Sequence, residues 1–241
     1  VVQPVPVRRR RLQQVRVDEV LQDVPGELDV EIGTTATELD SRSSLVSTQE
    51  AAMGNLIADA QLAATDDEQG AVAAFMNPGG VRADLPAGEI TYEEAFTVQP
   101  FANNLVTLDL TGAQVQCLLE QQYTTGKVLQ PSDTVRYTVT AAGTPSTTGD
   151  CAGGRVLDET VTIGGAAVVD GQTYRVTVNN FLAGGGDGFT VLTGGTNAVT
   201  GRFAVYEYDF ATATRGAALF EHPEVDVSSA IFAPDGSVDG V

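Results

Sequence analysis

Segments with the two-residue period of a β-strand and segments with the 3.6-residue period of a helix are mixed along the chain without a regular order. Strands are predicted over residues 27–39, 71–76, 104–110, 136–140, 160–163 and 174–179. Helices are predicted over residues 51–64, 111–122 and 207–219, with a short helical or turn segment over 89–96. This irregular order of elements predicts the α+β or mixed α/β class.

The two internal helices carry the clearest local signals. The first has apolar residues at helical spacing, namely Met53, Leu56, Ile57, Ala60 and Ala64. The second begins with Thr111 as its N-cap, and Gln114 three residues later completes a capping box. Further along, residues 141–155 are rich in Gly, Thr, Ser and Pro, which predicts a long loop.

The chain is strongly acidic, with 13 Lys and Arg against 32 Asp and Glu in 241 residues and a net charge of −19 at pH 7. This charge argues against nucleic acid or an anionic membrane surface as the partner, because both require clustered cations. No apolar run approaches the roughly 18 residues that a membrane span needs. Residues 1–14 lack the apolar core of a secretory signal. Because the sequence begins with valine, we interpret it as a processed or excised piece of a longer protein.

Three regions are expected from the distribution of charge and pattern. Residues 1–26 hold five arginines and are predicted to be an arginine-rich arm or interdomain linker, either solvated or in contact with an acidic neighbour. Residues 27–222 are predicted to form the folded domain. Residues 223–241 are predicted to form a polar C-terminal tail.

Histidine and cysteine are scarce, which limits the chemistry open to the chain. His222 is the single histidine, so a zinc protease motif is impossible and a dinuclear His/Asp metal site has too few ligands. A Ser-His-Asp triad would have to use this residue. The two cysteines, Cys117 and Cys151, cannot form a zinc ribbon. They are compatible with one disulfide in an oxidising compartment or with two buried thiols.

Three segments rich in turn-forming residues follow or adjoin predicted strands and carry polar or aromatic side chains. They are Asn77–Arg82, Val98–Asn103 and Asn179–Phe189. Glycines allow a ligand to approach the backbone closely, Asn77 offers an amide, and Arg82 offers a guanidinium for phosphate or carboxylate. Phe101 and Phe181 are two rings that can stack on a flat base, and Asp187 beside a glycine turn suits a ribose diol.

Each of these residues also has a simpler structural interpretation when taken alone. Phe101 and Phe181 are then core side chains, Asp187 binds turn amides, and Arg82 is a surface ion-pair partner. The sequence Gly-Gly-Gly-Asp-Gly matches neither a P-loop nor a dinucleotide-binding glycine motif.

Five sequence blocks considered together favour the functional interpretation. The blocks are Met53–Ala60 (MGNLIADA), Asn77–Leu85 (NPGGVRADL), Gly88–Phe101 (GEITYEEAFTVQPF), Leu108–Gln122 (LDLTGAQV with LEQQ) and Tyr174–Phe189. In these blocks the chain resembles the C-terminal domain of the 5'-nucleotidase family, which includes bacterial UDP-sugar hydrolase, vertebrate ecto-5'-nucleotidase and 2',3'-cyclic nucleotide phosphodiesterases. The resemblance covers about residues 28–192. It implies an α+β fold with layered mixed sheets flanked by helices.

The resemblance also implies roles for particular residues in recognition of a nucleotide or nucleoside. The base would stack between Phe101 and Phe181, and Asp187 would bind the ribose. The residues of the loop that carries the NPGGVR motif would contact the substrate, as would Asn103, which is a weaker assignment at the base edge. The loop residues are Asn77, Gly79, Gly80 and Arg82.

Catalysis in this family belongs to a separate N-terminal metallophosphoesterase domain, whose motifs do not occur in this sequence. The resemblance therefore implies that this chain binds no cofactor, while two divalent metal ions belong to the missing domain of the same polypeptide. The chain alone is expected to be inactive, and the whole enzyme to hydrolyse phosphoric esters outside the cytoplasm, at the cell surface or in the periplasm. A stand-alone, non-catalytic nucleotide-binding or cell-surface interaction module is the alternative, and hydrolysis through His222 is a minor one.

Two positions depart from the family pattern or are left open by it. Ser47 occupies a place where the family usually carries arginine, which is expected to weaken the hold on phosphate or favour less charged nucleotides. Cys117 and Cys151 are not fixed by the family motif, so a disulfide and two unpaired thiols both remain open.

Overall fold

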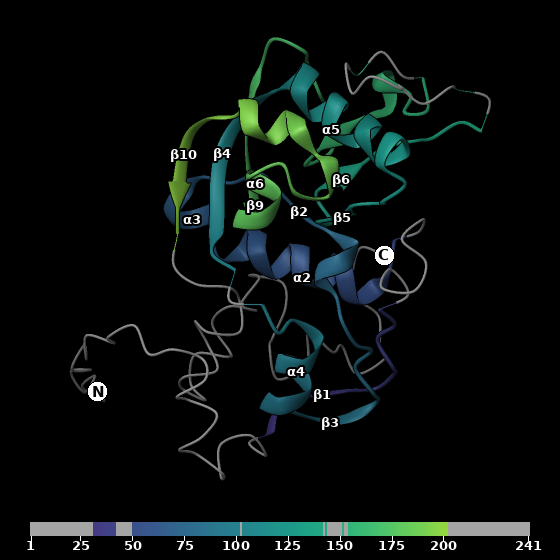
Figure 1. Cartoon of the computed structure of the whole chain (residues 1–241), viewed down its shortest axis with the longest axis vertical. Coiled ribbons are helices and arrows are strands. Elements are labelled where there is room, and N and C mark those ends of the chain that lie inside the picture. Colours follow the sequence, from purple (N-terminus) through teal and green to yellow (C-terminus); the bar gives the residue numbers. More distant parts are fainter. Residues whose placement is uncertain are drawn as a thin grey trace, which may run out of the picture.

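The computed structural model describes residues 31–41, 50–101, 103–141, 143, 151 and 154–201 (Figure 1). Several sequence-based predictions lie outside these residues and stay predictions: the arm over 1–26, the helix over 207–219, the tail over 223–241, Ser47 and His222. Within the described part, helices and mixed sheets form the α+β fold that the sequence predicts.

A five-stranded mixed sheet forms the centre of the fold (Figure 1). Its strands, in spatial order, are β10 (Thr196–Thr200), β4 (Leu105–Thr111), β9 (Thr173–Asn179), β2 (Ala73–Met76) and β5 (Gln130–Pro131). β2 runs parallel to β9, and all other neighbours are antiparallel. The sequence predicts β2, β4 and β9 correctly, whereas β5 and β10 were not expected, because each is short or exposed and lacks an apolar alternation.

Two helices cover opposite faces of this sheet (Figure 1). They are α2 (Ala52–Ala63) and α5 (Gly112–Thr125), both close to their predicted bounds. Ala73 and Phe75 of β2 pack in the same apolar cluster as Leu118 of α5, while Met76 packs with Leu56 of α2. Successive residues of β2 thus point to different helices, and the strand is buried on both faces.

Helix α5 begins and ends as its sequence dictates. Thr111 Oγ1 accepts a hydrogen bond from the Gln114 N–H at 3.2 Å, and Gln114 Oε1 accepts one from the Thr111 N–H at 2.8 Å. This confirms the predicted capping box. Gly126 ends the helix in the left-handed conformation, with φ of 69°, which a residue with a Cβ rarely adopts. Lys127 is the residue directly after this turn.

Smaller elements flank the sheet. The antiparallel pair β1 (Glu31–Thr35) and β3 (Gly88–Thr91) leads into α4 (Tyr92–Val98), so the segment 89–96, predicted as one helix or turn, is a strand followed by a helix. Short strands form a second antiparallel sheet in the order β6 (Val135–Arg136), β7 (Thr162–Ile163) and β8 (Ala166–Ala167). Other short helices are α3 (Asp66–Gln69) and the 3-10 helix η3 (Asp158–Thr160).

The loop that joins β6 to the later strands is attached to α5 at two points. Cys117 of α5 forms a disulfide with Cys151, 34 residues further along the chain. One turn later, the buried carboxylate of Glu120 accepts hydrogen bonds from the backbone N–H groups of Arg155, at 3.1 Å, and Val156, at 2.8 Å. Both attachments hold the end of the loop predicted over 141–155 against the helix.

Replacing both cysteines by serine is expected to lower the free energy of unfolding by about 2–4 kcal/mol, because the cross-link closes a long loop in the unfolded chain. Denaturant unfolding of the oxidised wild type and of the Cys117→Ser, Cys151→Ser double variant measures this difference. Peptide mapping without reductant should recover the two cysteines in one linked fragment. Quantitative labelling of two free thiols in the native protein would contradict the pairing.

Edge strand β10 is fastened to β4 by a polar cluster. Asp109 Oδ1 lies 2.8 Å from Arg175 Nη1, and Asp109 Oδ2 accepts a hydrogen bond of 2.7 Å from Asn197 Nδ2. These contacts favour the ionised carboxylate: the hydrogen bonds from Asn197 and from Arg175 lower the pKa of Asp109 from its ordinary value of 3.8. Asp109 therefore stabilises the fold while it is charged.

A carboxyl whose pKa is lowered by folding contributes its full stability above the unfolded value and loses it as the pH falls through the folded value. The stability difference between wild type and Asp109→Asn should therefore be greatest above about pH 4 and shrink at lower pH. Urea unfolding of both proteins from pH 7 to pH 2 measures it. A difference that stays constant across this range would contradict the assignment.

Candidate functional site

The three segments singled out in the sequence meet at one edge of the five-stranded sheet. Because β2 and β9 are parallel, with Phe75 opposite Val178, both strands end at this edge. Antiparallel β4 begins there, with Leu105 opposite Asn179. The loops that follow β2, precede β4 and follow β9 are therefore neighbours. The carboxyl ends of strands in open α/β sheets are a common place for ligand sites.

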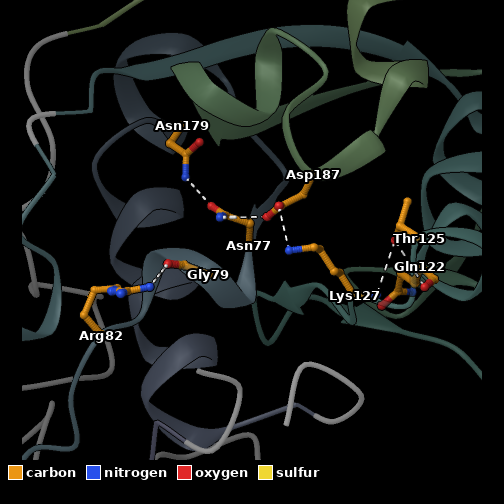
Figure 2. A network of polar contacts seen from close by, with 8 residues as sticks. All are labelled: Asn77, Gly79, Arg82, Gln122, Thr125, Lys127, Asn179 and Asp187. Atoms are coloured by element: carbon orange, nitrogen blue, oxygen red, sulfur yellow. Dashed lines mark hydrogen bonds and ion pairs between the residues drawn. The ribbon is translucent and has the colours of Figure 1, made fainter. Parts of the chain in front are cut away.

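Asn77, directly after β2, is buried and contacts the segment Asn179–Phe189 at two points (Figure 2). Its Oδ1 accepts a hydrogen bond of 2.8 Å from Asn179 Nδ2, and its Nδ2 donates to Asp187 Oδ2 at 3.2 Å. Asn179 is itself fixed as the N-cap of α6 (Asn180–Ala183), where its Oδ1 accepts from the Leu182 N–H at 2.9 Å. The chain of amides places the Asp187 carboxylate beside the loop after β2.

Asp187 lies in a glycine-rich turn with an uncommon backbone conformation. Its φ is 56°, between Gly185 at 83° and Gly188 at 89°. A left-handed conformation costs a residue with a Cβ about 1 kcal/mol or more, so side-chain contacts must hold it. Besides Asn77, the carboxylate meets the Lys127 ammonium, with Nζ 2.9 Å from Oδ1 (Figure 2).

Phe101 and Phe181 are both exposed, at 40% and 46%, so the interpretation of these rings as core side chains is wrong. The segments that carry them are joined by two hydrogen bonds between Asn104 and Asn180. The Asn180 N–H donates to the Asn104 carbonyl at 2.8 Å, and the Asn104 N–H donates to Asn180 Oδ1 at 2.9 Å. Two exposed aromatic rings are thus presented from adjoining loops at the same edge of the sheet.

Arg82 belongs to the same edge. Its backbone N–H donates to the Val98 carbonyl at 2.7 Å, which holds it against the segment that leads to Phe101. Its guanidinium lies over the Phe101 ring, 5.8 Å from the centroid, and donates to the Gly79 carbonyl at 3.3 Å. The exposed cation and the ring support each other through a cation–π contact, and the interpretation of Arg82 as a surface ion-pair partner has no contact to support it among the described residues.

The two glycines of the loop after β2 have different surroundings. A Cβ at Gly79 would lie 3.7 Å from Asp187 Oδ2, so this position faces the carboxylate. A Cβ at Gly80 would clash with Cε of buried Met76, so Gly80 permits close packing of the loop on the strand. Asn103 lies in the turn after Phe101, where its N–H donates to the Phe101 carbonyl at 2.7 Å. The structure therefore brings all the sequence-predicted loops to one edge.

Two members of the polar network were not assigned by sequence reasoning. Asn179 lies inside a segment that was recognised, but its role as an amide bridge depends on β2 lying next to β9. Lys127 lies 60 residues before Asp187 and follows a helix with no chemical motif. The one local signal was Gly126, whose place after a capped helix predicts a sharp turn there.

Among residues 31–201, as far as the structure describes them, no group of three or more His, Cys, Asp or Glu side chains is placed to hold a metal ion. In the same residues, no helix combines the length and the apolar character that crossing a bilayer requires.

Comparison with known proteins gives one consistent result. Residues 31–194 match the family described as "5'-nucleotidase, C-terminal domain". Over 214 residues the chain is 35% identical to a 5'-nucleotidase of Vibrio vulnificus, covering 88% of this chain and 34% of that protein. It is 34% identical to protein UshA of Escherichia coli over 166 residues, covering 69% of this chain and 28% of that protein. The chain belongs to the family of 5'-nucleotidase C-terminal domains.

A solved structure agrees with this assignment. The crystal structure of a 5'-nucleotidase precursor from Thermus thermophilus matches with a TM-score of 0.67 and 34% sequence identity, covering 79% of this chain and 38% of that one. The match supports the described arrangement of sheets and helices. Here, as with the curated relatives, the match spans only part of the longer protein, from 28% to 38% of its length.

The position of the Phe181 ring depends on a glycine in the turn beneath it. A Cβ at Gly186 would lie 2.5 Å from the ring, whereas one at Gly184 would meet only carbonyl oxygens at 3.5 Å. We therefore expect Gly186→Ala to displace the ring and Gly184→Ala to leave it in place, because the second contact is an ordinary van der Waals distance. NMR of the protein with labelled phenylalanine, which reports ring chemical shifts, measures this. Equal shifts in the two variants would contradict it.

Proposed function

We propose that this chain is the nucleotide- or nucleoside-recognition domain of a 5'-nucleotidase-like phosphohydrolase. The observation that carries the proposal is the pair of exposed rings, Phe101 and Phe181, at the same edge of the sheet as the Asp187 carboxylate. Large exposed apolar side chains beside a fixed carboxylate favour a ligand with a flat apolar part and a hydroxylated part. A nucleoside has both.

The base is proposed to stack between Phe101 and Phe181. Stacking on aromatic side chains contributes about 1–3 kcal/mol per base and tolerates any base. The ribose is proposed to donate its hydroxyl hydrogens to Asp187, whose two oxygens have free acceptor positions besides their contacts with Asn77 and Lys127. This arrangement recognises the nucleoside without selecting a particular base.

The remaining assigned residues are proposed to complete the pocket. Arg82 provides an exposed guanidinium for an anionic group of the substrate. Gly79 and Gly80 keep the loop after β2 free of side chains near Asp187, and Asn77 orients the carboxylate. Asn103 is proposed to contact the edge of the base from the turn after Phe101.

Hydrolysis is proposed to take place in another domain of the same polypeptide, which is expected to hold two divalent metal ions. The described residues offer no metal-holding group, so no step of catalysis is assigned to them. The chain alone is proposed to bind substrate without cleaving it. The match with the 5'-nucleotidase of Vibrio vulnificus covers 88% of this chain but only 34% of that protein, which supports this division.

The protein is proposed to work outside the cytoplasm, at the cell surface or in the periplasm. A relative from Listeria monocytogenes, 32% identical over 186 residues that cover 73% of this chain and 23% of that protein, is named cell wall protein Lmo0130. The disulfide between Cys117 and Cys151 fits an oxidising compartment.

Calorimetric titration with adenosine and AMP, in the presence of a chelator, tests the proposal. Wild type should bind both, and Phe101→Ala and Phe181→Ala should each weaken binding by about tenfold or more, because each removes one face of the stack. Val169→Ala is the matched control, since Val169 is also exposed, at 57%, and lies on another part of the chain.

Three outcomes of this titration distinguish the proposed stacked-base pocket from its alternatives. Binding that is lost in both phenylalanine variants and kept in the control supports the stacked-base pocket. Binding that is unchanged in either phenylalanine variant contradicts the stacking assignment. No binding by wild type contradicts recognition by the chain alone and favours a cell-surface interaction module or a pocket that the partner domain completes.

A further inference from the structure

Lys127 is the single lysine of this chain, since the other 12 of its 13 basic residues are arginines. It follows Gly126, the left-handed residue that ends α5. Its backbone is fixed there, because the Lys127 N–H donates to the Gln122 carbonyl at 3.1 Å and to Thr125 Oγ1 at 3.3 Å. The turn at the end of α5 thus directs one ammonium group toward the glycine-rich turn that holds Asp187 (Figure 2).

The two oxygens of Asp187 are held by different donors from different elements (Figure 2). Asn77 Nδ2 lies 3.2 Å from Oδ2, and Lys127 Nζ lies 2.9 Å from Oδ1. Two donors on two oxygens fix the plane of the carboxylate. With one donor removed, the carboxylate can rotate about its terminal bond, because this torsion has a broad and shallow preference.

The segment directly after the glycine-rich turn is attached to α5 independently of this ion pair. Gln121 of α5 makes hydrogen bonds with Thr190 Oγ1 at 3.0 Å and with the Val191 N–H at 3.3 Å. The side chain of Lys127 is 38% exposed, beside an Asp187 side chain that is 13% exposed, so water screens the ammonium and limits what the ion pair contributes to stability. The geometry therefore assigns Lys127 to orientation rather than to folding.

We propose that Lys127 is a positioning residue for sugar recognition: it fixes the Asp187 carboxylate in the orientation that accepts both hydroxyl hydrogens of a ribose 2',3'-diol. The inference rests on the proposed role of Asp187. A diol donates two hydrogen bonds to one carboxylate only when both acceptor oxygens face it together, so loss of orientation costs the two-point contact. The contact of the base with Phe101 and Phe181 is independent of Lys127.

The test compares adenosine with 2',3'-dideoxyadenosine, which carries the same base and lacks both hydroxyls. Calorimetry gives the affinity ratio for wild type, Lys127→Gln, Lys127→Arg and the control Arg136→Gln, which removes one charge from exposed Arg136. Wild type and Arg136→Gln should prefer adenosine. Lys127→Gln should reduce this preference about three- to tenfold, the equivalent of one hydrogen bond, without changing affinity for dideoxyadenosine. Lys127→Arg should recover part of the preference.

The outcomes distinguish failure of this inference from failure of the proposed function. If wild type binds both nucleosides equally, recognition of the diol by Asp187 is wrong, and the role of Lys127 is wrong with it. If wild type prefers adenosine and Lys127→Gln keeps the full preference, only the role of Lys127 is overturned. If Lys127→Gln weakens binding of both nucleosides by the same factor, its effect is structural and the inference is again overturned.

Chemical labelling of the wild-type protein tests whether Lys127 lies beside the bound diol. This experiment does not depend on the folding of a variant. Because the chain has one lysine, limited acetylation followed by mass spectrometry reports on this amine alone, apart from the N-terminus. Saturating adenosine should slow acetylation of Lys127 more than saturating dideoxyadenosine does. Equal rates with the two nucleosides would contradict a place for Lys127 beside the diol.

Discussion

The parallel pairing of β2 with β9 is the constraint on which the site depends. It brings two strands that are about 100 residues apart in sequence to a common edge, with Ala73 opposite Val176 and Phe75 opposite Val178. A parallel pair requires a long crossover connection, which here contains β4, α5 and the second sheet. The polar side chains at the ends of the two strands, Asn77 directly after β2 and Asn179 as the last residue of β9, meet because of that register.

The pairing is stabilised by the different apolar clusters on the two faces of β2. Phe75 packs toward α5, and Met76 packs toward α2. Met76 also meets buried amides, because Asn179 Nδ2 lies 3.4 Å and Gln61 Nε2 3.3 Å from its sulfur. The end of the strand is therefore rigid where Asn77 begins the loop. Rigid elements beneath a site limit the movement of its side chains, which favours specific binding.

Asp187 shows how the fold supports a conformation that local sequence alone does not favour. Its left-handed backbone is flanked by glycines that adopt the same region freely. Its carboxylate is held by Asn77 from the loop after β2 and by Lys127 from the turn after α5. Contacts from two distant segments thus oppose the local backbone cost, which is common where a side chain is held ready for a ligand.

The sequence by itself determined the features that depend on near neighbours. The capping box of Thr111 and Gln114 and the helix over 52–63 follow from side chains a few residues apart, so α2 and the start of α5 were predicted closely. The end of α5 was predicted at residue 122, three residues before its observed end at Thr125. The family blocks also contain most of the three segments that meet at one edge of the sheet. Tertiary structure decided what depends on distant pairing: the edge strand β10, the exposure of the two rings, and the contacts of Lys127 with Asp187. Sequence periodicity carries no record of which strand lies beside which, and only the packed sheet brings those groups together.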